Sequence, residues 1–225
     1  VEAGLRSGDW RMPEEHNRVI VDHISDLMFS PTEGASRHLR REGVQGAISV
    51  VGNTVVDAVL ENRRRAARRG ILKRLGLHSK KDYFLFTVHR EENVDNLETI
   101  KRLRRVFERL SRRFHVPMIF VVHPRTRHRL SFFGQLKTLE KIEGLRLVEP
   151  VGYLDFTRLL SECRMAFTDS GGVQEEACIL RVPCVTLRDS TERPETVRVR
   201  ANLLAGMNPE AVTRAAERML RRSAR

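Results

Sequence analysis

Cysteine, aromatic residues and long apolar runs are all scarce in this chain. Its 225 residues include 3 cysteines and an aromatic fraction of 6%. No apolar run approaches the ~20 residues that a membrane-spanning helix needs. The opening residues, Val1 to Gly4, lack the charged and apolar regions of a signal peptide. We therefore expect a cytoplasmic location and no membrane partner.

The three cysteines show no metal-ligand spacing. Cys163, Cys178 and Cys184 lie in or beside apolar segments, where small buried side chains are typical. We expect neither disulfides nor a metal site, and a reducing compartment fits this pattern.

Positive charge is abundant, with a formal net charge of +12 that comes mostly from arginine. Arginine clusters occur in predicted helices at 63–65, 68–69, 104–105 and 112–113. Apolar stripes run beside them, formed by Val55, Val59 and Leu60 in one helix and by Ile100, Leu103, Val106 and Leu110 in another. We interpret the clusters as solvated helix faces. No aromatic side chains interleave with them to stack on bases, so we expect no nucleic-acid partner.

Short apolar segments alternate with helical patterns along the whole chain. The predicted strands are 27–30, 48–51, 83–88, 118–122, 145–148, 165–168, 182–187 and 203–204. The predicted helices are 14–25, 32–41, 55–69, 97–114, 125–133, 153–161, 172–180 and 209–222. This alternation predicts an α/β fold with doubly wound parallel sheets and ligands at the carboxyl ends of the strands.

A boundary is predicted between residues 52 and 80, where a basic helix is followed by two glycines and the polar stretch 78–81. The part after residue 83 has enough strands for a complete Rossmann-like domain. The two strands before residue 55 are too few to form one. We predict that residues 1–55 are the C-terminal half of a first Rossmann-like domain, and that 56–225 form the second, nucleotide-binding domain.

The segment 165–196 is the most informative part of the sequence. A short strand ends in Asp169, Ser170, Gly171 and Gly172, and a new helix begins there. Such a turn leaves backbone N–H groups unpaired at the positive end of the helix dipole, which favours phosphate.

Side chains of the same segment extend this anion site. Ser170 offers a hydroxyl donor, Glu175 and Glu176 offer acceptors for sugar hydroxyls, and the Arg193 fork suits a diphosphate. Together these residues predict a nucleotide-sugar pocket.

Two histidines also follow predicted strands. His89 and Arg90 end one strand and His123 ends another, and His is the natural proton carrier near neutral pH. Parallel strands would bring these residues, 149–153, 170–172 and 188–193 to one sheet edge. By contrast, the acids in 1–9 and 12–18 are explained as well by a surface turn and by a helix opening.

The motifs resemble the non-hydrolysing UDP-N-acetylglucosamine 2-epimerases. They are VEAGLRSGD, MPEEHNR, FSPTE, VGNTVVDA, TVHREEN, VVHP, FTDSGGVQEEA and RDSTERPET, in that order from Val1 to about Gly206. The resemblance implies two Rossmann-like domains of the glycosyltransferase-B type, the first one incomplete here. It implies interconversion of UDP-N-acetylglucosamine and UDP-N-acetylmannosamine for cell-surface polysaccharide precursors, in a homodimer without metal, NAD or another cofactor.

The resemblance also implies roles for particular residues. Glu2, Glu14 and His89 match the catalytic positions of the family. The residues that match its substrate-binding positions are Arg90, His123, Val151, Phe156, Ser170, Gly171, Gly172, Glu176 and Arg193. Of these, Ser170 to Gly172 match diphosphate donors, Glu176 the ribose acceptor, and Phe156 and the backbone around Val151 the uracil site. Arg90 and His123, with Glu15, also match segments that bind substrate as an activator in some bacterial members.

The chain departs from the family pattern at both ends. Family members place a strand, a Gly-rich loop and another catalytic Asp before the VEAG motif, and a crossing helix at their C-terminus. The resemblance therefore implies a truncated chain, and we expect residues 1–225 alone to bind UDP weakly and to epimerise little or nothing. Normal turnover by this chain would contradict that expectation.

Two alternatives remain open at the level of the sequence. A hydrolysing epimerase uses similar motifs and releases free N-acetylmannosamine. A UDP-sugar-binding module without catalysis would keep the pocket and lack proton exchange at C2.

Overall fold

The computed structural model describes residues 1–77 and 81–223, so part of the predicted polar stretch 78–81 lies outside the described residues. All the strands in these residues run parallel. They are β1 (Leu27–Ser30), β2 (Ala47–Val50), β3 (Phe84–Thr87), β4 (Met118–Val121), β5 (Leu145–Val148), β6 (Met165–Thr168), β7 (Cys184–Thr186) and β8 (Asn202–Leu204). The predicted α/β class with parallel sheets is therefore confirmed.

Six of the strands form one sheet in the order β5-β4-β3-β6-β7-β8. The chain starts in the middle at β3, moves outward to β5, and returns to the other side of β3 with β6. The order thus reverses between β3 and β6. Loops that leave neighbouring strands at such a point diverge and leave a crevice, which is where open α/β sheets bind ligands.

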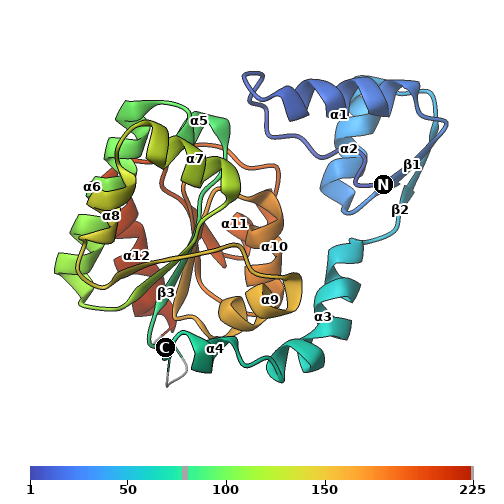
Figure 1. The fold of residues 1–225 in the computed structure, drawn as a ribbon. Coiled ribbons are helices and arrows are strands. Elements are labelled where there is room, and N and C mark those ends of the chain that lie inside the picture. The colour runs from blue at the N-terminus through green and yellow to red at the C-terminus, as the bar shows by residue number, and fades with distance from the viewer. Residues whose placement is uncertain (78–80, 224–225) are drawn as a thin grey trace.

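Helices cover both faces of this sheet (Figure 1). In chain order the helices are α1 (Pro13–Ile24), α2 (Glu33–Glu42), α3 (Thr54–Ala67), α4 (Ile71–Arg74), α5 (Glu91–Val94), α6 (Leu97–Phe114), α7 (Pro124–Phe132), α8 (Leu136–Glu140), α9 (Tyr153–Glu162), α10 (Gly171–Ile179), α11 (Pro194–Arg198) and α12 (Pro209–Ser223).

Alternate residues of each central strand supply two separate cores. In β3, Phe84 and Phe86 pack with α5 to α8 and α12 on one face, whereas Leu85 packs with α4, α9 and α10 on the other. A strand that is buried on both faces must be apolar at every position. This explains why the predicted strands appear in the sequence as unbroken apolar runs.

The N-terminal part is a two-stranded parallel sheet, β1 and β2, with α1 and α2. Its core is small: Ala3, Met28 and Leu39 are buried there, with Val44 and Ile48 beside them. Helix α3 leads from this part along the side of the larger one (Figure 1) and packs against α9 and α10.

Most predicted elements are present within one or two residues of their expected ends. The short helices α4, α5, α8 and α11 have no counterpart among the predicted helices. Each has only four or five residues, which is too short for a 3.6-residue period to show.

The apolar stripe predicted for the first basic helix is partly wrong. Val59 is buried against the rest of the protein, but the Leu60 side chain is 54% exposed. Helix α3 contacts its neighbours along a narrow strip, so a residue next to Val59 in sequence points outward. In α6 all four predicted stripe residues are buried.

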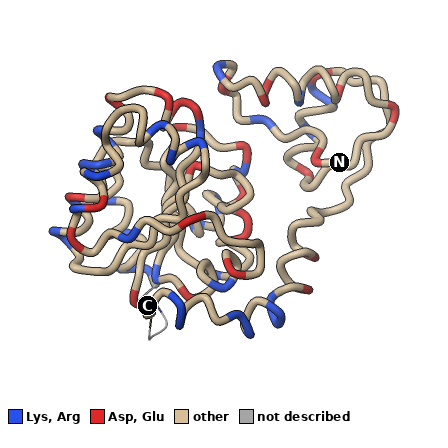
Figure 2. The backbone as a smooth tube through the Cα atoms, viewed as in Figure 1, with Lys and Arg blue, Asp and Glu red and all other residues tan. Residues whose placement is uncertain are grey.

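Basic residues recur along α6 and at the ends of α3 and α4, where the backbone is blue in Figure 2. Many of them pair with acids, such as Arg69 and Arg74 with Asp155 at 2.7 and 2.9 Å. No helix in the described parts of the chain combines the length and apolarity that a membrane span needs.

Candidate functional site

The loops that follow five parallel strands lie at one edge of the large sheet. They carry His89 after β3, His123 after β4, Val151 after β5, Ser170 after β6 and Arg188 after β7. The strand pairing therefore brings together the predicted strand-end residues at the point where the strand order reverses. The His89 and His123 rings lie 5.3 Å apart, measured between centroids.

A buried carboxylate, Asp169, joins the two loops at the reversal point. Its oxygens accept hydrogen bonds from the backbone N–H of His89 at 3.0 and 3.1 Å and of Arg90 at 2.9 Å, and from the side-chain amide of Asn93 at 3.0 Å. His89 Nε2 is also 3.8 Å from Asp169 Oδ1. Asp169 thus fixes the backbone that presents the His89 side chain. In the sequence, Asp169 is marked only by its position directly after an apolar strand, and we predicted no role for it.

The pKa of His123 is lowered below its ordinary value. The cause is partial burial, with the neighbouring His89 adding to it. His123 is therefore a neutral ring at pH 7, able to accept a hydrogen bond as well as to donate one. In the structure its ring nitrogen accepts from the backbone N–H of Arg125 at the start of α7.

The N-terminus of α10 is open for an anion. Ser170 is its N-cap, and its hydroxyl oxygen accepts from the Val173 N–H at 3.5 Å. Among the described residues, the backbone N–H groups of Gly171 and Gly172 meet no acceptor. Unpaired amides at the positive end of a helix dipole are an arrangement that favours an anion, and α10 has nine residues.

The two glycines of this turn differ in their surroundings. A Cβ added at Gly171 would overlap the Glu192 Oε1 atom and lie 3.1 Å from its Cδ, whereas a Cβ at Gly172 would meet nothing nearer than Ser170 Oγ at 4.0 Å. Packing in this structure therefore requires a residue without a side chain at position 171 but not at position 172.

Arg193 is held between two carboxylates in this structure. Its Nη2 donates to Glu2 Oε1 at 3.0 Å, and its Nε lies 3.0 Å from Glu175 Oε2. Glu175 also accepts from the side-chain amide of Asn53 at 2.7 Å, at the start of α3. The Arg193 fork, which is predicted to bind a diphosphate, thus contacts two carboxylates here. One of them is Glu175, a predicted acceptor for sugar hydroxyls. Glu2 of the N-terminal part reaches the α10 region through its contact with Arg193.

Burial raises the pKa of Glu175 to about 7, because desolvation outweighs the attraction of Arg193 and the nearby Glu2 adds repulsion. Glu176, one position along, also has its pKa raised to about 7 by burial. Glu176 meets no cation or hydrogen-bond donor among the described residues. It is a half-buried acceptor that lacks a protein partner.

The two acids at the start of α1 have different environments. Glu14 is half-exposed and forms an ion pair with Arg90 across the gap between the two parts. Glu15 is buried and accepts from the backbone N–H groups of Ser7 at 3.0 Å and Gly8 at 2.9 Å. Burial opposes its ionisation, but these N–H groups keep the Glu15 pKa below its usual value. Glu15 orders the loop before α1, while Glu14 faces the site.

Val151 and Phe156 lie beside the α10 side of the sheet edge. Both are partly buried and pack against the core that includes Leu159, Leu160 and Ala177.

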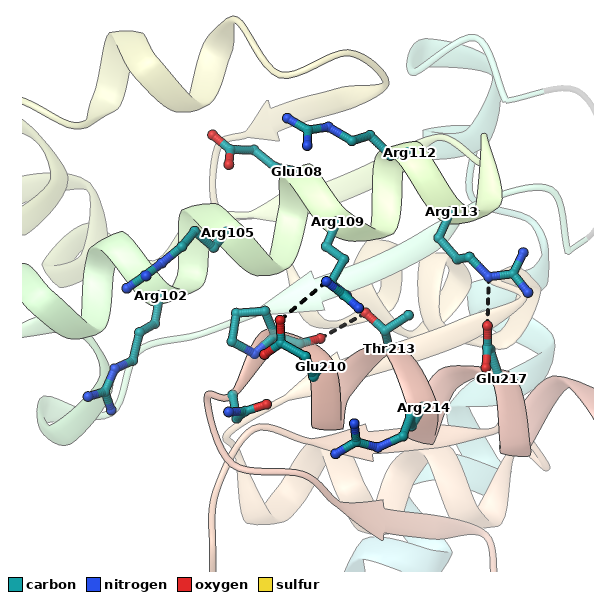
Figure 3. A pocket seen from close by; sticks show the side chains of 12 residues that line it. Arg102, Arg105, Glu108, Arg109, Arg112, Arg113, Glu210, Thr213, Arg214 and Glu217 are labelled. Carbon is teal, nitrogen blue, oxygen red and sulfur yellow. Dashed lines mark hydrogen bonds and ion pairs between the residues drawn. The ribbon is translucent and has the colours of Figure 1, made fainter.

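A cavity of about 940 Å³ lies elsewhere, between α6 and α12 (Figure 3). It is lined by six arginines and three glutamates, and none of the predicted site residues borders it. Two of its arginines are paired, Arg109 with Glu210 at 3.2 Å and Arg113 with Glu217 at 2.6 Å. Its walls contain no aromatic side chain. The cavity is a groove between two charged helix faces.

We expect this groove not to bind duplex DNA, because its three glutamates repel the phosphate backbone and two of its arginines are already paired with acids. A mobility-shift titration at low salt checks this. A shifted band that weakens steeply as salt is raised would contradict the expectation.

The described residues contain no group of three or more His, Cys, Asp or Glu side chains arranged to hold a metal ion. Cys163 and Cys184 are buried free thiols, and Cys178 is a half-buried free thiol.

Comparison with known proteins gives a family assignment. The family model described as UDP-N-acetylglucosamine 2-epimerase matches residues 1–225. The curated enzyme of that name from Methanocaldococcus jannaschii is 49% identical over 223 residues, and the match covers 98% of this chain and 61% of that protein. UDP-2,3-diacetamido-2,3-dideoxy-D-glucuronate 2-epimerase from Pseudomonas aeruginosa is 38% identical, over 98% of this chain and 60% of its own length.

The structural match is equally extensive. The M. jannaschii UDP-GlcNAc 2-epimerase, solved in complex with UDP-GlcNAc and UDP, matches with a TM-score of 0.91 and 50% identity, over 98% of this chain and 61% of that one. The expected glycosyltransferase-B type of fold is confirmed by this match. The chain spans about 61% of the length of these M. jannaschii relatives, and it belongs to the UDP-N-acetylglucosamine 2-epimerase family.

Proposed function

We propose that this chain interconverts UDP-N-acetylglucosamine and UDP-N-acetylmannosamine by epimerisation at C2. The observation that carries the proposal is the open N-terminus of α10 at the strand-order reversal, with His89 on the adjoining loop and Glu2 and Glu14 reaching it through Arg193 and Arg90. An anion site next to proton-transfer groups suits a substrate that loses a proton from the carbon next to the one that carries its diphosphate.

The proposed reaction has two halves. A carboxylate takes the C2 proton, the C1–O bond breaks, and its electron pair leaves with UDP, which gives 2-acetamidoglucal. UDP then adds back to C1 while a proton is delivered to the opposite face of C2. Glu2 and Glu14 are the proposed proton carriers. His89, together with the donors at α10, stabilises the charge on the departing UDP.

In the proposed binding mode, the diphosphate lies on the N–H groups and hydroxyl of Ser170 to Gly172. The ribose hydroxyls donate to Glu176, which supplies the partner that this carboxylate lacks in the protein. Uracil lies beside Phe156, with its edge bonded to backbone near Val151. Arg193 approaches the phosphates, and Arg90 and His123 contact the substrate at the same edge.

Further properties remain proposals. We place the division between the two Rossmann-like domains at residue 55, where α3 has just begun. We also propose a homodimer in the cytoplasm that needs no cofactor and makes precursors of cell-surface polysaccharides. The relatives that are named as epimerases of UDP-sugars support the reaction.

Incubating the chain with UDP-N-acetylglucosamine in deuterium oxide tests the proposal. Proton NMR is expected to show only a slow loss of the C2 proton signal and a slow appearance of UDP-N-acetylmannosamine, because residues 1–225 alone are expected to epimerise little. Free N-acetylmannosamine with UDP would support the hydrolysing alternative. Calorimetric UDP binding without any C2 exchange would support a binding module, and neither binding nor exchange would contradict the proposal.

Replacing Glu176 by glutamine is expected to weaken UDP binding but to stabilise the chain above neutral pH. Since the pKa of Glu176 is raised from 4.5 to about 7, the folded state holds a proton that the unfolded state releases. Stability therefore falls as pH rises from about 4.5 to 7. Glutamine removes that loss, so the gain in melting temperature should be larger at pH 8 than at pH 5.

Thermal unfolding at the two pH values and a UDP titration measure both effects. Asp57→Asn, which changes an exposed acid of α3, serves as the control. Equal gains at both pH values, or unchanged UDP affinity, would contradict the role given to Glu176.

A further inference from the structure

Glu192 occupies an unusual position beside the proposed anion site. It lies in the loop between β7 and α11, its side chain is 2% exposed, and its carboxylate fills the space that a side chain at position 171 would need. The first residue of α10 therefore packs directly against a buried negative charge. Sequence reasoning gave Glu192 no role.

Three guanidinium groups from three separate segments converge on this carboxylate. Arg188, from the same loop, bonds to it at 3.0 Å. Arg18 of α1 lies 3.7 Å away and Arg90 of the loop after β3 lies 3.9 Å away. Glu192 is thus the common partner of cations from both parts of the chain.

Two of these arginines have a second acidic partner in α1. Arg90 pairs with Glu14, and Arg18 pairs with Glu15 at 3.2 Å. Acids and arginines therefore alternate across the gap between α1 and the sheet edge, in the order Glu15, Arg18, Glu192, Arg90 and Glu14. Arg188 adds a third cation beside Glu192. Of these three acids, Glu192 lies in a loop of the large-sheet part, whereas Glu14 and Glu15 lie in α1.

The neighbouring arginines keep the Glu192 side chain ionised. Burial opposes its ionisation, but Arg188 and Arg18 keep its pKa below the usual value, so it is a carboxylate at neutral pH. Removing one member of such a buried set leaves the others uncompensated, which is costly. Without the charge on Glu192, Arg18 and Arg90 would repel Arg188 and lose their common anchor.

We propose that Glu192 is a positioning residue that docks α1 against the large sheet, through Arg18 and Arg90, so that Glu14 faces the N-terminus of α10. Glu192 acts through the arginines and touches no reacting atom. The consequence for catalysis rests on the proposed function, whereas the docking itself does not.

Hydrogen–deuterium exchange of the backbone amides, followed by mass spectrometry, tests the docking without any ligand. Glu192→Gln keeps the shape and removes the charge. It is expected to speed exchange in α1 by about tenfold or more while β3 and β6 keep their protection. Glu195→Gln is the matched control. This acid is also near the gap, where it accepts from Thr32 at 3.2 Å, and the variant should leave α1 unchanged.

A second variant covers the case in which Glu192→Gln does not fold. Arg18→Gln removes the α1 partner from a half-buried position and should produce the same selective loss of protection in α1. Unchanged exchange in α1, or a loss spread equally over α1, β3 and β6, would overturn the proposal, since the second pattern marks a general fall in stability.

The catalytic consequence is measured separately by C2 deuterium incorporation into UDP-N-acetylglucosamine. Glu192→Gln is expected to lower the rate at saturating substrate about tenfold or more, with uridine affinity unchanged, because uridine lacks the groups that face α1. Absence of exchange in the parent chain would count against the proposed function alone, and the amide-exchange result would still decide the role of Glu192.

Discussion

Replacing Gly171 by alanine is expected to lower the free energy of unfolding by about 1–3 kcal/mol and to weaken UDP binding by at least about tenfold. The added Cβ would overlap Glu192 Oε1. That carboxylate cannot move away cheaply, because it is buried and bonded to Arg188 at 3.0 Å. The methyl group must therefore displace either the start of α10 or the arginine cluster, and both border the proposed diphosphate site.

Gly172→Ala provides the control for stability within the same turn. A Cβ at that position meets open space, and alanine is favoured over glycine inside a helix by roughly 0.5–1 kcal/mol. Urea denaturation should therefore show Gly171→Ala destabilised and Gly172→Ala unchanged or stabilised. Equal effects at the two positions would contradict the packing described for Gly171.

Replacing His89 by alanine or Glu14 by glutamine is expected to cut the rate of C2 deuterium incorporation by ~10²-fold or more in each case. His89 is held by backbone hydrogen bonds to Asp169 at the strand-order reversal, and Glu14 faces the same edge through Arg90. The prediction concerns the ratio of variant to parent rates, so it applies at any absolute rate that NMR can follow.

His128→Ala is the matched control for His89, since His128 is exposed on α7. UDP affinity should change little in the His89 and Glu14 variants if they act on the proton and on developing charge. Parent-like exchange rates in both variants would remove these residues from the site.

The strands, and the meeting of their carboxyl ends at one edge of the sheet, could be predicted from the sequence. A strand that is buried on both faces is apolar at every position, so it appears in the sequence as an unbroken apolar run. Phe84 to Phe86 and Met165 to Phe167 are apolar without interruption. Strand-end polar residues such as His89 and Ser170 then stand out at once. Parallel pairing, which the alternation with helices implied, brings such residues to one edge.

The individual contacts of the site could not be predicted in this way. Nothing local distinguishes Gly171, which packs against Glu192, from Gly172, which faces open space. Asp169 and Glu192 are single acids without a periodic pattern. The residues that bond to Asp169, and Arg18 and Arg90 beside Glu192, are distant in sequence, although Arg188 is in the same loop as Glu192. Arg193 was expected to bind a diphosphate, and its two protein partners lie 191 and 18 positions away in the chain. Such pairings depend on the tertiary fold, which the sequence does not record locally.

A crystal structure of the chain with UDP is the sharpest test of the proposed binding mode. The diphosphate is expected at the N–H groups of Gly171 and Gly172, the ribose hydroxyls at Glu176, and uracil beside Phe156. UDP bound instead in the arginine-lined groove between α6 and α12 (Figure 3), with the start of α10 empty, would contradict it.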